Sequence, residues 1–369
     1  MAIVFRVDWR SGDHIMGSMA NHMTKRIMFM GAGAIGGTLA GYLSRAGRDV
    51  TVVDSWPAHI EKIKSDGLTV TTMEGTFTAK PEALHIGELS ATTNRYDVIF
   101  VSVKSYDTAW VTTLVEPHLA PGGVIVSAQN GINEDIIAGI VGWDRVIGCI
   151  VTIGATTVGP GHVERTSKER GRRSFALGDP TNANSLRLEM LCEILEDCGE
   201  TSITTNLLGE RWAKIVTNSM ANSVCGITGQ SSAGMRLNPV TLDLSMLLAS
   251  EVVAVGTAHG VAIENIGRVP AQDFVTARTD PAVRAEVARK LAEDAHKIGT
   301  GRPSLAQDIA KGRRTEIDYL NGYVIRKGKE AGVRTTFNEA IVELTNKVES
   351  GLLEPMVDNI WLVMDYPPE

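Results

Sequence analysis

The sequence lacks the features that mark several common classes of protein. Its 369 residues contain no long block of charge of one sign, and the formal net charge is −7. Such a chain offers no basic field that would attract nucleic acid or an anionic membrane surface. No apolar run approaches the roughly 18 residues that a membrane-spanning helix needs. With 43% hydrophobic and 21% charged residues, the composition indicates a soluble globular protein with neither nucleic acid nor membrane as a partner.

Cysteine is also scarce, and its spacing excludes two further kinds of site. None of the four cysteines forms a C-x-x-C pair, so the sequence predicts no zinc site, no redox pair and no other metal centre. We expect buried free thiols in a reducing, cytoplasmic compartment. The cysteines are Cys149, Cys192, Cys198 and Cys225.

The first 23 residues fit no targeting signal. Residues 1–7 are too short for a secretory apolar core, and the next residues are interrupted by the charges of Asp8, Arg10 and Asp13. We interpret residues 1–23 as a disordered extension, and a misassigned start is the alternative, because several methionines precede residue 24.

A glycine fingerprint at residues 31–36 is the most informative feature that the sequence does contain. An apolar run of strand length, residues 26–30, leads into Gly31-Ala-Gly-Ala-Ile-Gly36, and an apolar-patterned segment follows at residues 38–43. A G-x-G-x-x-G pattern between a strand and a helix is typical of dinucleotide binding. Gly31 would permit the tight turn, Gly33 the approach of a pyrophosphate, and Gly36 the close packing of helix on strand. The expected cofactor-binding residues here are Gly31, Ala32, Gly33, Ala34, Ile35 and Gly36.

Strand and helix patterns alternate after residue 25, which predicts an α/β domain with a parallel sheet. The apolar run at residues 96–103 is typical of a strand buried on both faces. Residues 68–72 and 76–86 are interpreted as a hairpin inserted in this sheet, and the later strands as antiparallel. Predicted strands cover residues 26–30, 49–53, 123–127, 146–153, 162–164, 174–178 and 201–204, and predicted helices cover 57–66, 108–114 and 184–198.

From residue 207 onward the strand signal disappears and helical periodicity replaces it. The predicted helices cover residues 207–225, 241–259, 280–297, 304–321 and 337–350. We therefore expect a Rossmann-type dinucleotide-binding domain at residues 24–205 and an all-α substrate and catalytic domain at residues 206–369.

Polar residues come after the ends of three predicted strands, where open α/β sheets bind their ligands. Asp54 ends the second strand and would accept hydrogen bonds from the ribose hydroxyls of NAD, while a turn or cap role before Pro57 is the alternative. Lys104 could hold an anionic substrate or a cofactor phosphate, or be solvated. Asn130 could contact the nicotinamide ribose and the substrate, or simply form a turn with Gly131.

The first helix of the second domain carries an unusual polar row. Lys214, Asn218 and Asn222 succeed one another at intervals of four residues, which places them on one face. A buried face with one ammonium and two amides needs partners or a ligand, so the spacing favours a binding site. Further along, Ser304 followed by Gln307 has the spacing of a helix N-cap, and Glu316 alone would be interpreted as an exposed helical acid.

In combination, these segments resemble the ketopantoate reductase family. The resemblance covers about residues 25–350 and rests on the glycine fingerprint, Val103-Lys104, Gln129-Asn-Gly131, Trp212-Ala-Lys214 with both asparagines, Ser304 with Gln307-Asp308, and Thr315-Glu-Ile-Asp318 with Asn321-Gly322. It implies a Rossmann-type domain, an all-α domain, a cleft between them, and NAD(P)H-dependent reduction of a 2-oxo acid.

The resemblance also implies residue roles. Lys214 would be the general acid that protonates the carbonyl oxygen, and Glu316 would lie near it as the second catalytic residue. Lys104 would lie beside cofactor and substrate, and Asn130 would bridge the two. The implied substrate-binding residues are Asn130, Asn218, Asn222 and Ser304.

Two positions depart from the family pattern. The family is usually described as preferring NADPH, whereas Asp54 favours NADH because a carboxylate repels a 2′-phosphate; Lys62 and Lys64 could still neutralise that phosphate. Gly301 stands where many members have an asparagine, so another 2-oxo acid, or oxidation of another hydroxy acid or alcohol by NAD, is an alternative to ketopantoate.

A non-catalytic dinucleotide sensor is a third hypothesis. Residues 356–364 are apolar and could dock on their own domain or on a partner subunit, as in a homodimer.

Overall fold

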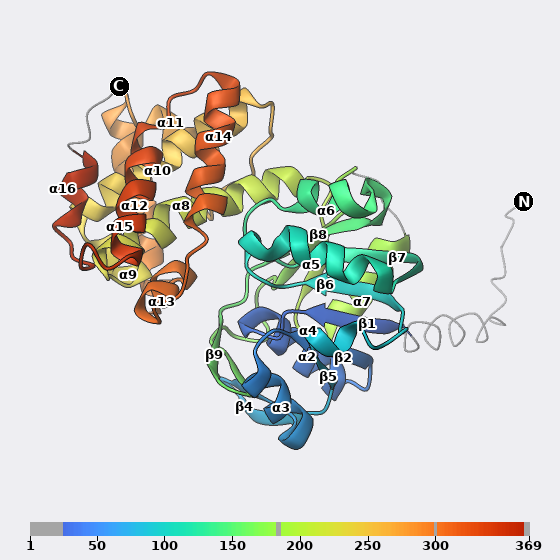
Figure 1. Cartoon of the computed structure of the whole chain (residues 1–369). Helices are drawn as coiled ribbons and strands as arrows, with labels where there is room; N and C mark the ends of the chain where they lie inside the picture. Colours follow the sequence, from blue (N-terminus) through green and yellow to red (C-terminus); the bar gives the residue numbers. More distant parts are fainter. Residues whose placement is uncertain (1–24, 182–185, 299–300, 365–369) are drawn as a thin grey trace, which may run out of the picture. The chain divides into compact units, whose positions relative to one another are not determined.

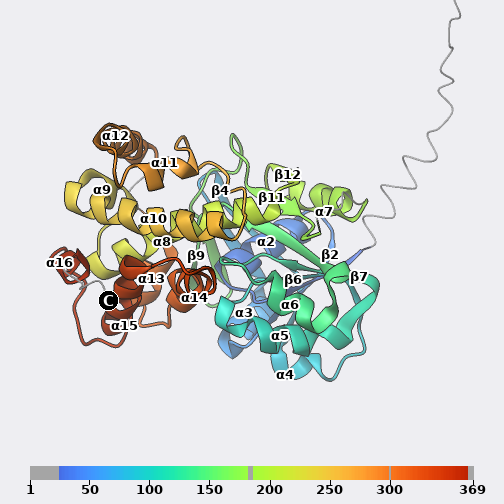
Figure 2. The same cartoon turned by 90° about the horizontal axis from the view of Figure 1, so that it is seen from above.

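The computed structural model describes residues 25–181, 186–298 and 301–364, and it divides them into two compact units. Within the described residues, the first unit holds residues 25–103, 107–128 and 134–205, and the second holds the remainder (Figures 1 and 2). The second unit thus includes two short segments, Lys104–Tyr106 and Gln129–Asn133, that come directly after strands of the first unit in the chain. The extension predicted at residues 1–23 lies outside the described residues.

An eight-stranded sheet forms the centre of the first unit, in the order β12-β11-β8-β7-β6-β1-β2-β5. The six strands from β8 to β5 are parallel to one another, and their order is the doubly wound order of a Rossmann domain. The strands are β1 (Arg26–Met30), β2 (Asp49–Asp54), β5 (Glu82–His85), β6 (Tyr96–Val101), β7 (Leu119–Ser127), β8 (Val146–Val151), β11 (Phe175–Gly178) and β12 (Thr201–Ile203). The expectation that β8 is antiparallel is correct only for its pairing with β11, because β8 runs parallel to β7.

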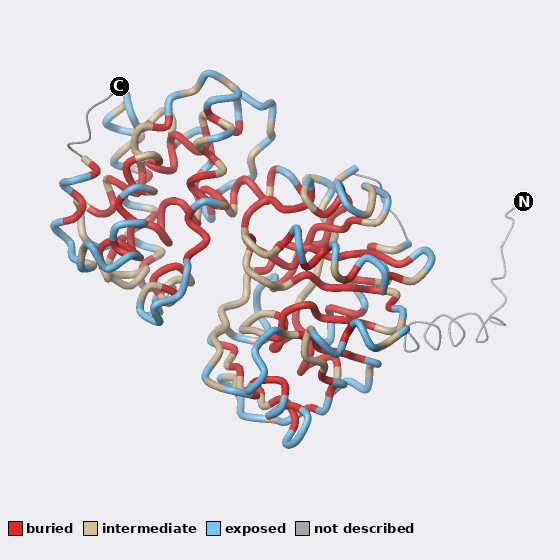
Figure 3. The backbone as a smooth tube through the Cα atoms, viewed as in Figure 1, coloured by how far each residue is buried: buried red, intermediate tan, exposed pale blue. Residues whose placement is uncertain are grey.

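Helices cover the faces of this sheet because its central strands are apolar on both sides, as the buried tube of β1 and β6 in Figure 3 shows. The helices of this unit are α2 (Ala34–Arg45), α3 (Pro57–Asp66), α4 (Ile86–Leu89), α5 (Thr108–Val115), α6 (Glu134–Val141) and α7 (Leu186–Glu196). The α3 prediction is confirmed at both ends, since Pro57 starts the helix and Gly67, with φ +92°, ends it. The first residues of the helix predicted at 184–198 lie outside the described residues.

A second, four-stranded sheet corrects the predicted hairpin. β3 (Leu68–Thr72) and β4 (Gly75–Ala79) do form a hairpin, but it pairs with β10 (His162–Arg165) and β9 (Ala155–Gly159) in the order β4-β3-β10-β9. Only β5, the next strand in the chain, joins the main sheet. Helix α2 contacts strands of both sheets and is buried from Gly36 to Leu43. The helix that begins at the glycine fingerprint is therefore held on two sides.

The described residues of the second unit form helices and loops but no strand, and one isolated bridge joins Ile266 and Val269. Its helices are α8 (Leu207–Thr228), α9 (Ser232–Leu237), α10 (Pro239–Ala258), α11 (Ala271–Thr276), α12 (Pro281–Ile298), α13 (Ser304–Ala310), α14 (Asn321–Ala331), α15 (Thr336–Glu349) and α16 (Asn359–Met364). The Asn206 side chain caps the start of α8, and Gly229, with φ +70°, ends it. α8 packs along α10 and contacts α13 and α15, so it lies at the centre of the unit (Figures 1 and 2).

Helix α10 is the one described helix that is long and apolar enough to cross a bilayer by length and composition. Its 18-residue window is 72% buried within the protein, as for the core helix of a folded domain. The sequence shows no uninterrupted apolar run of that length, because Asp243 and Glu251 lie within the helix.

The helix predicted at residues 304–321 is wrong. α13 ends at Ala310, and Gly312 adopts a φ of +60°, a conformation that interrupts a right-handed helix. A loop and the 3-10 turn η4 (Ile317–Tyr319) come next, and α14 begins only at Asn321. As a result, Glu316 lies in a loop and its side chain is buried, whereas its sequence alone suggested an exposed helical acid.

Candidate active site

Two of the three fingerprint glycines are required by the packing of the chain itself. Gly31 has a φ of +101°, and its N–H donates to the Val53 carbonyl at 2.8 Å, which joins the turn to β2. A Cβ on Gly36 would lie 2.0 Å from the Gly31 carbonyl oxygen and 2.3 Å from Ser102 Oγ. These two positions keep α2 close against the ends of β1 and β6, as the fingerprint predicts.

Gly33, the middle glycine of the fingerprint, is not required by any packing contact within the protein. A Cβ on Gly33 would meet nothing within 4 Å, and its φ of −68° suits any residue. Gly33 is also the N-cap of α2, where it provides no side-chain acceptor, and the first turn holds no acidic residue. The first N–H groups of a helix have no partner within it, so open space at an uncapped N-terminus fits a bound diphosphate.

Gly33→Ala is therefore expected to separate binding from folding. The added methyl group should lower affinity for NADH by roughly tenfold or more, about 1.4 kcal/mol, because it occupies the space that the diphosphate would take. The melting temperature should stay unchanged. Calorimetric titration and thermal unfolding measure both quantities, with Gly139→Ala on the exposed face of α6 as the control. Unchanged NADH affinity in Gly33→Ala would argue against a diphosphate at this loop.

Asp54 has a structural role that the sequence left as an alternative. Its Oδ2 accepts from the Ala32 N–H at 2.7 Å, and its Oδ1 accepts from the Trp56 N–H at 2.9 Å. The carboxylate thus joins the end of β2 to the glycine loop. Each carboxylate oxygen has two lone pairs, so these bonds leave acceptor capacity for ribose hydroxyls.

The side chains of His59 and Ser102 also hold the glycine loop, and no sequence motif predicted either of them. His59, which is 1% exposed, contacts the Ala32 carbonyl oxygen through Nε2 at 2.9 Å, and the Gly161 N–H donates to its Nδ1 at 2.9 Å. Because Nδ1 accepts, Nε2 carries the proton and donates to Ala32. Ser102 Oγ donates to the Gly31 carbonyl at 2.8 Å. The position of Ser102 at the carboxyl end of β6 was the one available signal for it.

A charged cluster lies within the second unit, which includes residues 104–106. Lys104 Nζ lies 2.5 Å from Asp308 Oδ2 and 3.2 Å from Glu316 Oε2. The two carboxylate side chains are 9% and 7% exposed, and that of Lys104 is 33% exposed. Glu316 Oε1 accepts from both the N–H and the hydroxyl of Ser105, at 2.9 and 3.0 Å.

The cluster shifts the proton affinities of its members. Burial alone would lower the pKa of the Lys104 ammonium, but Glu316 and Asp308 outweigh it and raise the pKa above its ordinary value. Burial raises the pKa of the Asp308 carboxyl, and Lys104 opposes that increase. Asp308 belonged to the motif that carried the family resemblance but was assigned no function, although it lies four residues after Ser304 and so shares its face of α13.

The segment at residues 129–133 is held in the same unit by several contacts. The Arg211 guanidinium, which is 2% exposed, donates to the Gln129 carbonyl at 2.7 Å. The Asn130 carbonyl oxygen accepts from Ser105 Oγ at 3.0 Å and from Asn133 Nδ2 at 2.8 Å. These bonds fix the main chain of Asn130, and Asn130 as a whole is half-buried. The signal for Asn133 and Ser105 was only their closeness to Asn130 and Lys104 in the chain.

The polar row of α8 is largely buried. Asn218 and Asn222 are each 6% exposed, and Lys214 is half-buried. Asn218 Nδ2 is buried and has no hydrogen-bond partner among the described residues. Asn222 Nδ2 lies 3.5 Å from Ser304 Oγ. A buried amide donor without a partner costs about 1–3 kcal/mol, and a ligand that accepts from it removes that cost.

Two predicted details of this region need correction. Ser304 is the first residue of α13 and comes after the N-cap, Pro303, so it does not cap the helix. Gln307 Nε2 donates instead to the Arg302 carbonyl at 2.9 Å. Ser304 is thereby left to contact Asn222, and the structure brings together these two of the predicted substrate-binding residues.

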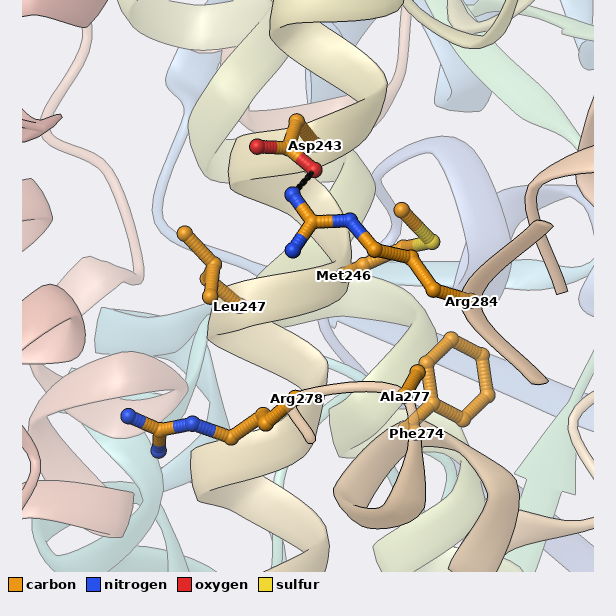
Figure 4. A pocket seen from close by; sticks show the side chains of 7 residues that line it. All are labelled: Asp243, Met246, Leu247, Phe274, Ala277, Arg278 and Arg284. Carbon is orange, nitrogen blue, oxygen red and sulfur yellow. Dashed lines mark hydrogen bonds and ion pairs between the residues drawn. The ribbon is translucent and has the colours of Figure 1, made fainter. Parts of the chain in front are cut away.

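Two cavities of the second unit are lined by other described residues. A cavity of about 10 Å³ lies beside the ion pair of Arg284 with Asp243, between α10, α11 and α12 (Figure 4). It has room for about one water molecule. A larger cavity of about 340 Å³ adjoins Ala306 and Ile309, which lie on the face of α13 turned away from Ser304.

The fold and the glycine loop define a dinucleotide-binding protein with a helical second unit, and comparisons with known proteins agree. The family model described as ketopantoate reductase PanE/ApbA matches residues 27–179, and the model of its C-terminal domain matches residues 206–349. The chain is 29% identical over 334 residues to the 2-dehydropantoate 2-reductase of Archaeoglobus fulgidus, covering 89% of this chain and 99% of that one.

Two solved structures extend the similarity to three dimensions. A PanE/ApbA family ketopantoate reductase from Ralstonia eutropha JMP134 matches with a TM-score of 0.74 and 25% identity, covering 88% of this chain and 99% of that one. A D-mandelate dehydrogenase bound to NADH and anilino(oxo)acetate matches with a TM-score of 0.75 and 23% identity, covering 89% and 99%, and shares the fold. The chain belongs to the ketopantoate reductase family.

Proposed function

We propose that this protein uses NADH or NADPH to reduce a small 2-oxo acid to its 2-hydroxy acid, with ketopantoate as the first candidate. The observation that carries the proposal is the row on α8, where Lys214 is followed by the buried amides of Asn218 and Asn222. Asn218 Nδ2 in this row is buried and has no hydrogen-bond partner among the described residues. A ligand with several oxygen atoms would use all three residues.

The proposed chemistry gives each part of the chain one task. The nicotinamide cofactor supplies a hydride when it is bound. Lys214 supplies the proton that the resulting alkoxide needs, a contribution typically of about 10²–10⁴ in rate. Ser304 and Asn222, which contact each other, bind the polar ends of the substrate. The N-terminus of α2 binds the diphosphate of the cofactor.

We assign Glu316 the second catalytic role and give it definite partners. Its carboxylate contacts Ser105 through one oxygen and Lys104 through the other. These bonds keep a charged group in a fixed position, as catalysis by positioned dipoles and charges requires. Lys104 and Asn130, whose segments belong to the same unit, complete the proposed contacts with cofactor and substrate.

The choice between the two cofactors rests on Asp54. Its carboxylate would accept from the ribose hydroxyls of NADH and repel the 2′-phosphate of NADPH. Asp54→Asn is the sharper test than Asp54→Ala, because the amide oxygen can still accept from the Ala32 N–H. We expect this variant to shift the ratio of kcat/KM values toward NADPH by roughly tenfold, about 1.4 kcal/mol. Steady-state kinetics with each cofactor measures this ratio, and an unchanged ratio would remove Asp54 from cofactor selection.

The alternative is the same reaction class with a different substrate, including oxidation of another hydroxy acid with NAD. Gly301 favours it, because many members of the family have an asparagine at this position. A screen of 2-oxo acids with each cofactor separates the two: turnover of ketopantoate above all others supports the first. Tight cofactor binding without turnover of any carbonyl compound would support a sensor and contradict both.

We further propose that the protein is cytoplasmic and forms a homodimer. Its four cysteines are free thiols, three of them buried, as in a reducing compartment. Near the end of the described chain, Leu352, Met356, Trp361 and Leu362 are all at least half exposed. Light scattering of the purified protein tests the dimer, and a monomer mass at high concentration would contradict it.

A further inference from the structure

An exposed tryptophan lies beside the carboxylate at the end of β2. Trp56 comes two residues after Asp54, and its N–H donates to Asp54 Oδ1 at 2.9 Å. Its side chain is 36% exposed, so part of the indole is open to a ligand. The bond to Asp54 fixes the main chain of Trp56 next to the group proposed to hold a ribose.

The orientation of this indole ring is also fixed. It stacks on the His59 ring, with centroids 5.2 Å apart and planes 6° from parallel. His59 cannot rotate freely, because its two nitrogens are bonded to Ala32 and Gly161 on opposite sides. Trp56 therefore has a defined plane, set by the same histidine that supports the glycine loop. A turn or an N-cap would need neither the ring nor its stacking partner.

We propose that Trp56 is the platform on which the adenine ring of the dinucleotide stacks, with His59 as its positioning residue. The inference rests on the proposed nicotinamide cofactor and extends it to a residue of the adenosine half. In a dinucleotide the adenine is attached to the ribose that Asp54 would hold, so the base lies next to the residues that come after β2. Aromatic side chains stack on any nucleobase, because every base presents a π face.

Ligands that differ in their adenine provide the test. Binding of NADH, ADP-ribose and reduced nicotinamide mononucleotide, which has no adenine, is measured by calorimetry on the full chain. Trp56→Ala should weaken NADH and ADP-ribose by roughly 5- to 150-fold, since stacking on an aromatic residue contributes about 1–3 kcal/mol per base. Affinity for the mononucleotide should not change. Trp56→Phe, which keeps an aromatic face, should recover most of the loss.

The controls separate this inference from the proposed function. Trp143→Ala removes another exposed tryptophan of the first unit, one that precedes β8 at the amino end of the parallel strands, and should leave all three affinities unchanged. Equal NADH affinity in Trp56→Ala and the unaltered protein would overturn the stacking role alone. An equal loss for the mononucleotide would also overturn it, because the effect would then not depend on adenine. Failure of the unaltered protein to bind any of the three ligands would overturn the proposed function and this inference with it.

Discussion

Lys214→Ala is expected to lower kcat by roughly 10²–10⁴ while the affinity for NADH stays the same. The reason is that the ammonium group would act on the substrate oxygen, whereas the cofactor loop belongs to residues 31–36 of the other unit. Water would have to supply the proton in the variant. Steady-state kinetics gives kcat, and calorimetric titration gives the NADH dissociation constant.

A second substitution and a control make this result specific. Lys214→Arg keeps the positive charge, but a guanidinium does not give up its proton, so kcat should remain low. Leu208→Ala, at an exposed position of α8, should leave kcat unchanged. Turnover of Lys214→Ala close to that of the unaltered protein would exclude Lys214 as the proton donor.

Local patterns in the sequence predicted most strands of the main sheet, but they missed α6 and β9 and could not give pairing over long distances. The apolar run before Gly31 predicted β1 correctly, and Pro57 predicted the start of α3. The patterns at residues 68–72 and 76–86 predicted a hairpin in the main sheet, whereas β3 and β4 belong to the second sheet. β3 pairs with β10, more than 90 residues later, and no local property of either strand specifies this pairing.

For the candidate site, too, the sequence predicted local features but not contacts between distant residues. The spacing of Lys214, Asn218 and Asn222 predicted one face of one helix, and two of these side chains are buried as that interpretation requires. The contacts of Lys104 with Asp308 and Glu316 span more than 200 residues and could not be predicted. The helical periodicity of the sequence continues beyond Asp308, but α13 ends before Gly312, which has a positive φ. Glu316 therefore lies outside the helix, and its side chain is buried.

Lys104→Met is expected to destabilise the second unit, and more strongly at pH 8 than at pH 5. The substitution leaves Asp308 and Glu316 buried without their shared cation. Removing one partner of a buried pair typically costs about 3–5 kcal/mol, and we expect about 2–3 kcal/mol because a third of the Lys104 side chain is exposed. The melting temperature should fall by about 5–10 °C at pH 8. Thermal unfolding at the two pH values measures the difference.

The direction of the pH effect is set by the proton affinities. In the unaltered protein the Lys104 pKa is raised, so its contribution is complete below the ordinary lysine value and is lost only as the pH rises through the folded value. Burial already raises the Asp308 pKa, and loss of Lys104 raises it further. A carboxyl with a raised pKa in the folded state destabilises that state as pH increases, so the variant recovers stability in acid.

Two matched variants identify charge as the cause. Lys104→Met combined with Asp308→Asn removes one of the two unpaired carboxylates and should restore part of the melting temperature at pH 8. Lys347→Met breaks an exposed pair with Glu343 on α15 and should change stability by less than about 0.5 kcal/mol at either pH. An equal loss for Lys104→Met at pH 5 and pH 8 would mean that its packing, and not its charge, stabilises the cluster. A larger loss at pH 8 would show that one lysine, placed after β6 in the chain, neutralises two acids that the helical unit buries.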